Sequence, residues 1–301
     1  MFQIGQAFAL TFCQILNCPH CLLSESVRPK VVRRGTFWRK SDGRAIQRYR
    51  CLSCTKGFSR ATVHPCYRQN KRQMNEKVRG LLSSGVSQRR IARLLRLSRT
   101  TVVRKFLFIA KHANLELDEA NRRAPPAIVV EFDDLETIEH TKLKPLSVTL
   151  AVESKTRRIL GFEVSQMPAN GLLAQRSIKK YGPRRDQRST GRRRLFQKIK
   201  PLIAENAELK SDENPHYPRD VARLFPGCQH VTFKGQRGST TGQGELKKIR
   251  FYPLFSLNHT CAMLRANVNR LIRKTWCTTK RADRLQAHLA IYAHYHNQQL
   301  I

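Results

Sequence analysis

The sequence has few acidic residues and no long apolar run. Its 301 residues include 57 Lys or Arg but only 21 Asp or Glu, so the formal net charge is +36. No stretch approaches the roughly 20 apolar residues that a membrane-spanning helix needs. The apolar opening, residues 1–12, lacks a basic leader and a small-residue cleavage site, and is a poor match to a signal peptide. We expect this opening to be a short strand or helix, or upstream sequence that has been read into the coding frame.

The excess of positive charge predicts a protein that binds nucleic acid, with a membrane surface as the alternative. Hydrophobic residues make up 40% of the chain, which is too many for a disordered basic tail. A chain of this length can hold two or three domains. The first 111 residues contain 24 Lys or Arg and only three acids. We therefore expect this third to dock on DNA, with an affinity that falls steeply with salt.

Nine cysteines include two CxxC pairs, separated by 29 residues, which are Cys18 with Cys21 and Cys51 with Cys54. Four thiolates at this spacing predict a structural zinc site in a small β-ribbon module, residues 13–66, that needs the metal to fold. Phe58 is expected to be the hydrophobic plug of the ribbon. Redox-active or unbound thiols are the alternative. The cysteine pattern suits a protein with bound metal in a reducing cytoplasm better than it suits a protein with disulfides.

From about residue 71 the apolar pattern becomes helical, and it predicts a helix-turn-helix at 71–115. Ser87 and Ser98 are expected to be the N-caps of its two helices. The residues available for its core are Ile91, Leu94, Val102 and Phe106. The second helix is the expected recognition helix, and the side chains that would enter the groove of double-stranded DNA are Arg99, Thr100 and Arg104. An ordinary helical pair with a solvated basic face is the alternative.

A Pro-containing segment, 116–126, is expected to be a linker to a strand that starts at Ala127 and ends in carboxylates. With two further strand-like segments, 146–152 and 159–164, this strand predicts a three-stranded antiparallel meander. Carboxylates at the carboxyl end of a central strand lie where α/β sheets carry their chemistry. Asp133 is therefore a candidate to hold a metal ion against a phosphodiester, and a solvated acidic turn is the alternative.

The rest of the chain alternates between helices, loops and strands. The expected elements are a basic loop over nucleic acid or simply in solvent (184–194), a helix (194–206), a strand ending in Asp212 (207–213), a helix (219–225), a strand (230–233), a Gly-rich loop (236–244), a long helix (256–274) and a final helix (284–297). The Gly-rich loop matches no nucleotide-binding motif. The final helix carries three histidines, His288, His294 and His296, whose apolar neighbours favour packing over metal binding.

Together these features resemble transposases of the insertion-sequence-one type, over essentially the whole chain. The motifs that carry the resemblance are Glu131-Phe132-Asp133-Asp134, Lys210-Ser211-Asp212 and Arg270-Leu271-Ile272-Arg273-Lys274-Thr275. Such proteins are DDE enzymes with a ribonuclease-H-like core. The resemblance thus implies an α/β fold, with a mixed-sheet catalytic domain at 127–301 behind the zinc ribbon and the helix-turn-helix.

The resemblance implies that Asp133 and Asp212 are the first two catalytic carboxylates and hold catalytic Mg²⁺. The family's third acid corresponds to Asn258 here, followed by His259, and Glu245 in the Gly-rich loop is a competing candidate. Arg265 lies on the face of the helix that carries Asn258 and is expected to hold a phosphate.

The partners implied are the ends of a mobile element and target DNA. No membrane is involved, and a homodimer on paired ends is one arrangement. The expected location is the bacterial cytoplasm, near the nucleoid. The alternative functions are a transposase-derived protein that binds DNA without cutting it, and a ribonuclease-H-like nuclease without strand transfer.

Overall fold

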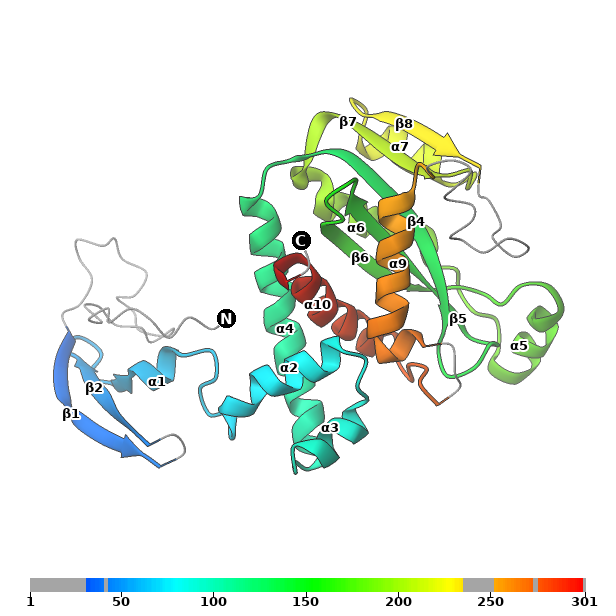
Figure 1. Ribbon diagram of the computed structural model, residues 1–301. Coiled ribbons are helices and arrows are strands. Elements are labelled where there is room, and N and C mark those ends of the chain that lie inside the picture. Colours follow the sequence, from blue (N-terminus) through cyan, green and yellow to red (C-terminus); the bar gives the residue numbers. More distant parts are fainter. Residues whose placement is uncertain (1–30, 41–42, 235–251, 273–275, 300–301) are drawn as a thin grey trace. The chain divides into compact units, whose positions relative to one another are not determined.

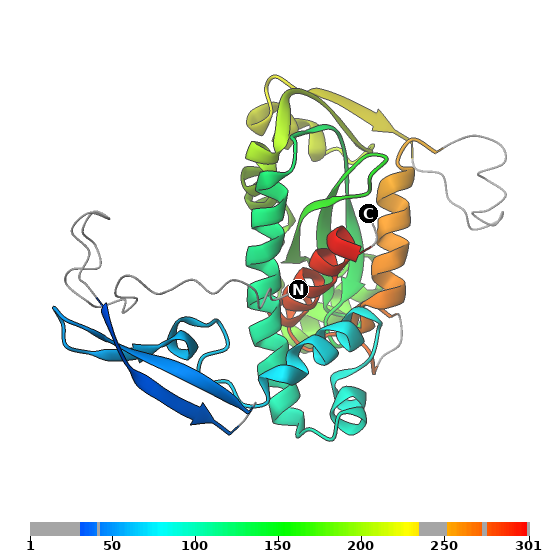
Figure 2. The ribbon, with the colours of Figure 1, turned by 60° about the vertical axis from the view of Figure 1, so that its left-hand side comes forward.

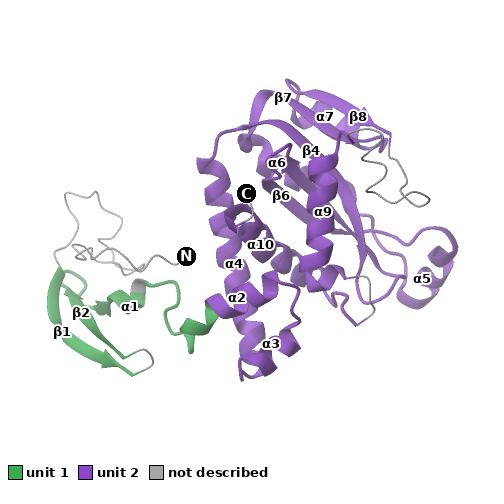
Figure 3. Ribbon diagram, in the orientation of Figure 1, with its two compact units in different colours: residues 1–75 green, residues 76–301 purple. Residues whose placement is uncertain are grey.

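The computed structural model describes residues 31–40, 43–234, 252–272 and 276–299 (Figure 1). The chain forms two compact units, residues 1–75 and 76–301 (Figure 3). Cys18, Cys21 and Glu245, which the sequence marked as candidate ligands, lie outside the described residues. Within the described ranges, no helix has the length and apolar character needed to cross a membrane.

The first unit contains a small antiparallel sheet, as the sequence predicted. Its strands are β1 (Val31–Arg39), β2 (Arg44–Cys51) and β3 (Gly57–Ser59), followed by the short helix α1 (Arg60–Val63). Tyr49, Cys51 and Phe58 form its core, and the rings of Tyr49 and Phe58 stack with their centroids 5.7 Å apart. Phe58 therefore fills the core of the ribbon, which confirms the prediction.

The second unit is built on a five-stranded mixed sheet in the order β6-β5-β4-β7-β8. The strands are β4 (Ala127–Ile138), β5 (Pro145–Glu153), β6 (Ile159–Gln166), β7 (Ile203–Asp212) and β8 (Gln229–Phe233). β4, β5 and β6 form the predicted antiparallel meander, whereas β4, β7 and β8 are parallel. The predicted α/β class is confirmed at this level.

Helices cover both faces of this sheet (Figures 1 and 2). One face packs on α4 (Arg99–Arg123), α9 (Phe255–Asn267) and α10 (Ala282–Gln299), and the other on α6 (Arg188–Ile199) and α7 (Tyr217–Leu224). α5 (Ala174–Tyr181) completes the helices around the sheet. Because both faces are covered, seven of the nine residues of β5 are buried, including Ser147 and Thr149 on one of its faces.

The helix-turn-helix is formed by α3 (Gln88–Leu94) and the start of α4, preceded by α2 (Asn75–Ser83). Both predicted N-caps are confirmed, because Ser87 Oγ accepts from Arg90 N (3.3 Å) and Ser98 Oγ from Thr101 N (3.1 Å). Three of the four predicted core residues are fully buried, but Leu94 is 57% exposed. Leu94 ends α3, and Leu97 in the turn fills the core instead.

The segment expected to be a linker, 116–126, is mostly helical, because α4 continues to Arg123. Tertiary contacts explain its length. Asn121 Nδ2 donates to the carbonyls of Ile159 (3.0 Å) and Leu160 (3.2 Å), and Leu117 is buried in the core of the sheet. The helix-turn-helix, expected as a separate domain at 71–115, is therefore part of the same compact unit as the sheet.

Two other expectations are wrong in their boundaries. α6 begins within the basic segment 184–194, and the expected helix at 194–206 ends at Ile199, before β7 starts at Ile203. The long helix expected from Ser256 ends at Asn267, where the buried Val268 takes an extended backbone, and a short 3-10 helix follows. In both places burial of apolar side chains against the sheet decided where the helix ends.

α10 confirms the predicted final helix, and its histidines are packed as expected. His288 Nε2 donates to the carbonyl of Leu82 (3.1 Å), and His296 Nε2 lies 3.0 Å from the carbonyl oxygen of Arg157. His294 Nε2 lies 3.0 Å from Glu116 of α4. These contacts join α10 to α2, α4 and the β5–β6 turn.

Close packing of α6 on β6 depends on Gly191. A Cβ at this position would lie 1.9 Å from Ser165 Oγ, far inside any normal contact. Gly161 on β6 makes a similar approach, with a Cβ 2.8 Å from Leu195. The two glycines therefore let the helix lie directly on the strand, which positions the neighbouring residue, Arg192.

Gly191→Ala is expected to lower the free energy of unfolding by about 1–3 kcal/mol, because the added methyl group overpacks the α6–β6 contact. Ser165→Gly in the same chain should recover part of the loss, since it removes the group that the methyl meets. Urea unfolding of the single and double variants tests this. Equal stability of Gly191→Ala and the parent would contradict the observed packing.

Candidate active site

Asp133 and Asp212 lie on two neighbouring parallel strands, β4 and β7. Asp212 ends β7, but the prediction that the first strand ends at the carboxylates is wrong, because pairing with β5 extends β4 past Asp133 to Ile138. The β4–β7 register pairs Glu131 with Lys210, and the two acids follow two residues later on each strand. Side chains alternate along a strand, so Asp133 shares a face with Glu131, and Asp212 lies opposite to the buried Leu209. Both carboxylates therefore belong to the sheet face that α9 covers.

Burial, followed by the charge of neighbouring acids, raises the pKa of both carboxylates. Desolvation, followed by the negative charge of Asp212, raises the pKa of Asp133 to about 7. Hydrogen bonds to Asp133 Oδ1 from Asp134 N (2.6 Å) and Tyr217 Oη (3.1 Å) act in the opposite direction. Burial also raises the pKa of Asp212, against a hydrogen bond from Asn214 N (3.1 Å). The site therefore concentrates negative charge that a divalent cation would neutralise.

Glu131 fixes the start of α9 above the two acids. Its carboxylate is almost fully buried and accepts from Leu257 N (2.8 Å) and from Ser154 Oγ (2.7 Å). The first backbone N–H groups of a helix have no partner within the helix, and a carboxylate there also favours the helix dipole. Sequence reasoning named Glu131 only as part of a motif and missed this role.

The residues that α9 presents to the acids are Asn258, Cys261 and Arg265, which share one helical face. Burial and the charges of Asp133 and Asp212 raise the pKa of Tyr252, while a hydrogen bond with Asn258 lowers it. Burial and then Asp133 raise the pKa of Cys261 to about 12, and Arg265 opposes this shift. Tyr252 and Cys261 thus feel the charge of the carboxylates, and Asn258 and Arg265 each act on one of these two residues.

His259 points its ring at the β5–β6 turn, where its Nδ1 lies 3.1 Å from Arg157 Nη1. Within the described ranges, no three His, Cys, Asp or Glu side chains form a group that could hold a metal ion. A cation at Asp133 and Asp212 would therefore draw further ligands from neutral oxygens, such as the Asn258 carbonyl, or from the substrate. The two carboxylates and the amide are oxygen donors, which Mg²⁺ prefers.

A buried arginine, Arg192, which the sequence did not single out, acts on Asp133 through Tyr217. Arg192 of α6 is 3% exposed, and its Nη2 lies 2.5 Å from Asp220 and its Nη1 3.8 Å from Asp134. Its guanidinium also lies over the ring of Tyr217, 4.9 Å from the centroid. Arg192 therefore holds Tyr217, the residue that donates to Asp133. In the sequence it is one of several arginines in a basic run, and nothing distinguishes it.

The structure describes two of the four predicted zinc ligands and all three predicted DNA-reading residues. Cys51 and Cys54 form a knuckle in which Cys54 N donates to Cys51 Sγ (3.5 Å), and Cys51 is buried. The expected recognition residues Arg99, Thr100 and Arg104 are all exposed on the first two turns of α4. No family model matches the chain, and no curated protein is significantly similar to it.

Tyr217→Phe is expected to raise the pKa of Asp133 above its value of about 7, because it removes a hydrogen bond that favours the charged carboxylate. Carboxyl ¹³C NMR titration of the metal-free protein measures this directly. Tyr181→Phe, at the end of α5, is the matched control and should leave the titration unchanged. An unshifted Asp133 in Tyr217→Phe would show that the Tyr217 contact does not act on it.

Cys51→Ser is expected to release about one zinc ion per chain and to unfold the β1–β3 sheet, as the ligand count of a structural site requires. Cys228→Ser, in the second unit, should keep the metal. Metal analysis and circular dichroism of the purified proteins give the answer. A parent protein that holds no zinc while this sheet is folded would rule out the zinc site.

Proposed function

We propose that this protein is a DDE-type DNA transposase with a ribonuclease-H-like catalytic sheet. The observation that carries the proposal is the pair Asp133 and Asp212 on neighbouring parallel strands, facing the helix that carries Asn258 and Arg265. The resemblance of the sequence to insertion-sequence-one transposases implies that these two strands lie side by side. It also implies that the third metal-site residue lies on the helix that packs against them.

The remaining parts suit binding to double-stranded DNA. The net charge of +36 favours a polyanionic partner. In the proposed mode, the start of α4 enters the major groove with Arg99, Thr100 and Arg104, and the zinc ribbon adds phosphate contacts. Each phosphate contact contributes to a salt dependence of the affinity. Such a protein would act at the bacterial nucleoid.

In this proposal Asp133 and Asp212 hold Mg²⁺, with the Asn258 carbonyl as a neutral ligand. When bound, the ion neutralises the phosphodiester and activates the attacking oxygen. The protein's residues position these groups for in-line attack by water and then by a 3′-hydroxyl. Arg265 holds a phosphate, Tyr217 and Arg192 orient Asp133, and Glu131 fixes α9. No covalent protein intermediate is required.

A second candidate is a transposase-derived protein that binds element ends without cutting them. It is favoured by one observation, the neutral Asn258 at the position where the family has an acid. A ribonuclease-H-like nuclease without strand transfer is the third candidate. An assay for Mg²⁺-dependent joining of labelled DNA ends separates the three, because only the transposase both cleaves and joins.

Replacement of the third residue tests the site. Asn258→Ala is expected to lower Mg²⁺-dependent end cleavage by more than about 100-fold, because even residues that only orient a metal ligand typically contribute about 10–100-fold. Asn258→Asp should keep or raise activity, since it supplies a charged oxygen. Glu245→Ala should have a mild effect, because a ligand on a helix is better positioned than one on a Gly-rich loop.

The reference variant is Asp133→Ala, which should be inactive in the same assay. If Glu245→Ala is as inactive as Asp133→Ala while Asn258→Ala cleaves normally, the third ligand is Glu245. If all four variants bind DNA and the parent neither cleaves nor joins, the non-catalytic candidate replaces the proposal.

A further inference from the structure

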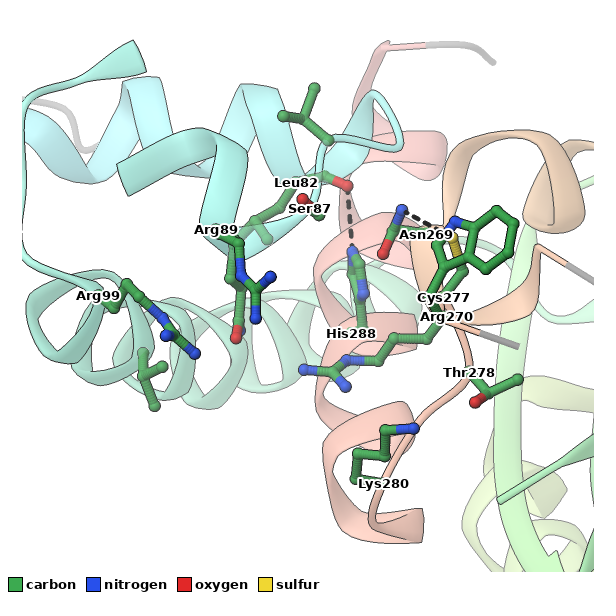
Figure 4. A pocket seen from close by; sticks show the side chains of 14 residues that line it. Leu82, Ser87, Arg89, Arg99, Asn269, Arg270, Cys277, Thr278, Lys280 and His288 are labelled. Atoms are coloured by element: carbon green, nitrogen blue, oxygen red, sulfur yellow. Dashed lines mark hydrogen bonds between the residues drawn. The ribbon is translucent and has the colours of Figure 1, made fainter. Parts of the chain in front are cut away.

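A cavity of about 280 Å³ lies between the helix-turn-helix and the segment that follows α9 (Figure 4). All of its lining belongs to the second unit. Four cationic side chains line it, and they come from three separate parts of the chain: Arg89 on α3, Arg99 on α4, and Arg270 and Lys280 after α9. The cavity is distinct from the carboxylate site, with which it shares no residue.

The positive charge of this cavity is not neutralised by the protein. Within the described part of the chain, none of the four cations forms an ion pair. The nearby acid, Asp283, is engaged by Arg281 at 2.8 Å. Burial, and then the charge of Arg284, lower the pKa of Arg270, so its positive charge is disfavoured where it stands. An anion in the cavity would relieve this repulsion.

The cavity lining also carries two buried polar atoms, one on His288 and one on Gln88. His288 is 2% exposed, and because a carbonyl oxygen only accepts, its Nε2 must carry the proton that it donates to Leu82. Its Nδ1 is therefore an acceptor, and among the residues that the structure describes neither this atom nor Gln88 Nε2 has a hydrogen-bond partner. Figure 4 shows His288 between Arg89 and Arg270. Buried polar groups normally have partners, so these atoms indicate a ligand or bound water.

We infer that this cavity binds a phosphate group. The Arg89, Arg270 and Lys280 side chains and the Gln88 amide would donate to its oxygens, with Arg99 at the edge that continues into the groove-binding helix. His288 Nδ1 would accept from a water or hydroxyl beside the phosphate. Arginine forks match phosphate oxygens with two parallel hydrogen bonds, which suits an anion held from several sides.

The favoured source of the phosphate is the DNA backbone. Arg99 belongs to the expected recognition helix, and a second hollow, lined by Arg89, Arg93 and Arg99 with Ala92 and Leu97, shares two of the cavity's cations. A strand that follows this hollow would reach the cavity directly. The DNA source rests on the proposed function, whereas the phosphate chemistry of the cavity does not. A free phosphate or nucleotide is the other source.

Trp276 provides a direct probe, because it lines the cavity and is 78% exposed. The sequence contains only two tryptophans, so Trp38→Phe leaves Trp276 as the sole indole. The experiment titrates this protein with a short mixed-sequence DNA duplex, inorganic phosphate, or a deoxynucleoside monophosphate, and follows the indole fluorescence. The affinity for the duplex is also measured over a range of salt concentrations.

Lys280→Gln should weaken the response of Trp276 and reduce the steepness of the salt dependence by about 0.9, the contribution of one phosphate contact. Lys280 is exposed, so this variant should fold, and Lys280→Arg should keep the parent's salt dependence. Arg122→Gln is the matched control. It removes one charge from the far end of α4, about 35 Å along the helix from Arg99, and should change neither quantity.

A response to the duplex that Lys280→Gln weakens supports the DNA backbone. A response to phosphate or nucleotide without one to the duplex supports the phosphate site and excludes the DNA backbone as its source. The inference is overturned if no probe alters Trp276 fluorescence, or if Lys280→Gln leaves the response to every probe unchanged. A parent that binds the duplex but never cleaves it would refute the transposase without touching this inference.

Discussion

The parallel pairing of β4 with β7 is the constraint on which the candidate site depends, because it brings Asp133 and Asp212 onto neighbouring strands. Burying two like charges is costly, and the raised pKa of Asp133 and of Asp212 records that cost. The surrounding groups lower it only in part, through Tyr217 and the backbone of Asp134 and Asn214. A site arranged for stability alone would have a basic side chain beside Asp133 and Asp212. Here the buried arginine, Arg192, lies instead on the opposite face of β4, near Asp134.

One short motif supplies three acids with three different roles, because side chains alternate along β4. Asp133 faces the site. Asp134 points to the opposite face, where Thr149 Oγ1 donates to it (2.5 Å) and Arg192 lies near it. Glu131 is buried beneath α9 and holds that helix by its backbone. The motif therefore does more than provide a ligand, since it also fixes the helix that carries Asn258.

The helix-turn-helix and the five-stranded sheet are parts of one compact unit, because α4 contributes to both. Its first two turns carry the exposed residues expected to read DNA, and its last turns bond to β6 through Asn121. α10 packs along α4, and His288 joins it to α2. DNA held by the start of α4 would thus be held at a fixed distance from the carboxylates, with no flexible linker between them. This rigidity sets the geometry in which any cleavage would occur.

Local patterns in the sequence determined the presence of strands β4 to β6, the caps at Ser87 and Ser98, the core position of Phe58 and the position of Asp212 at the end of β7. Each of these follows from hydrophobic periodicity or from a hydrogen bond within a few residues, so neighbouring residues are enough to predict it. The length of α4, the end of α9, the contacts of Glu131, and the joining of Arg192, Tyr217 and Asp133 were decided only by the tertiary structure. Arg192 and Tyr217 are 25 positions apart, and Glu131 and Leu257 are 126 positions apart. Contacts over such separations leave no periodic signal in one sequence, because they depend on which elements pack together.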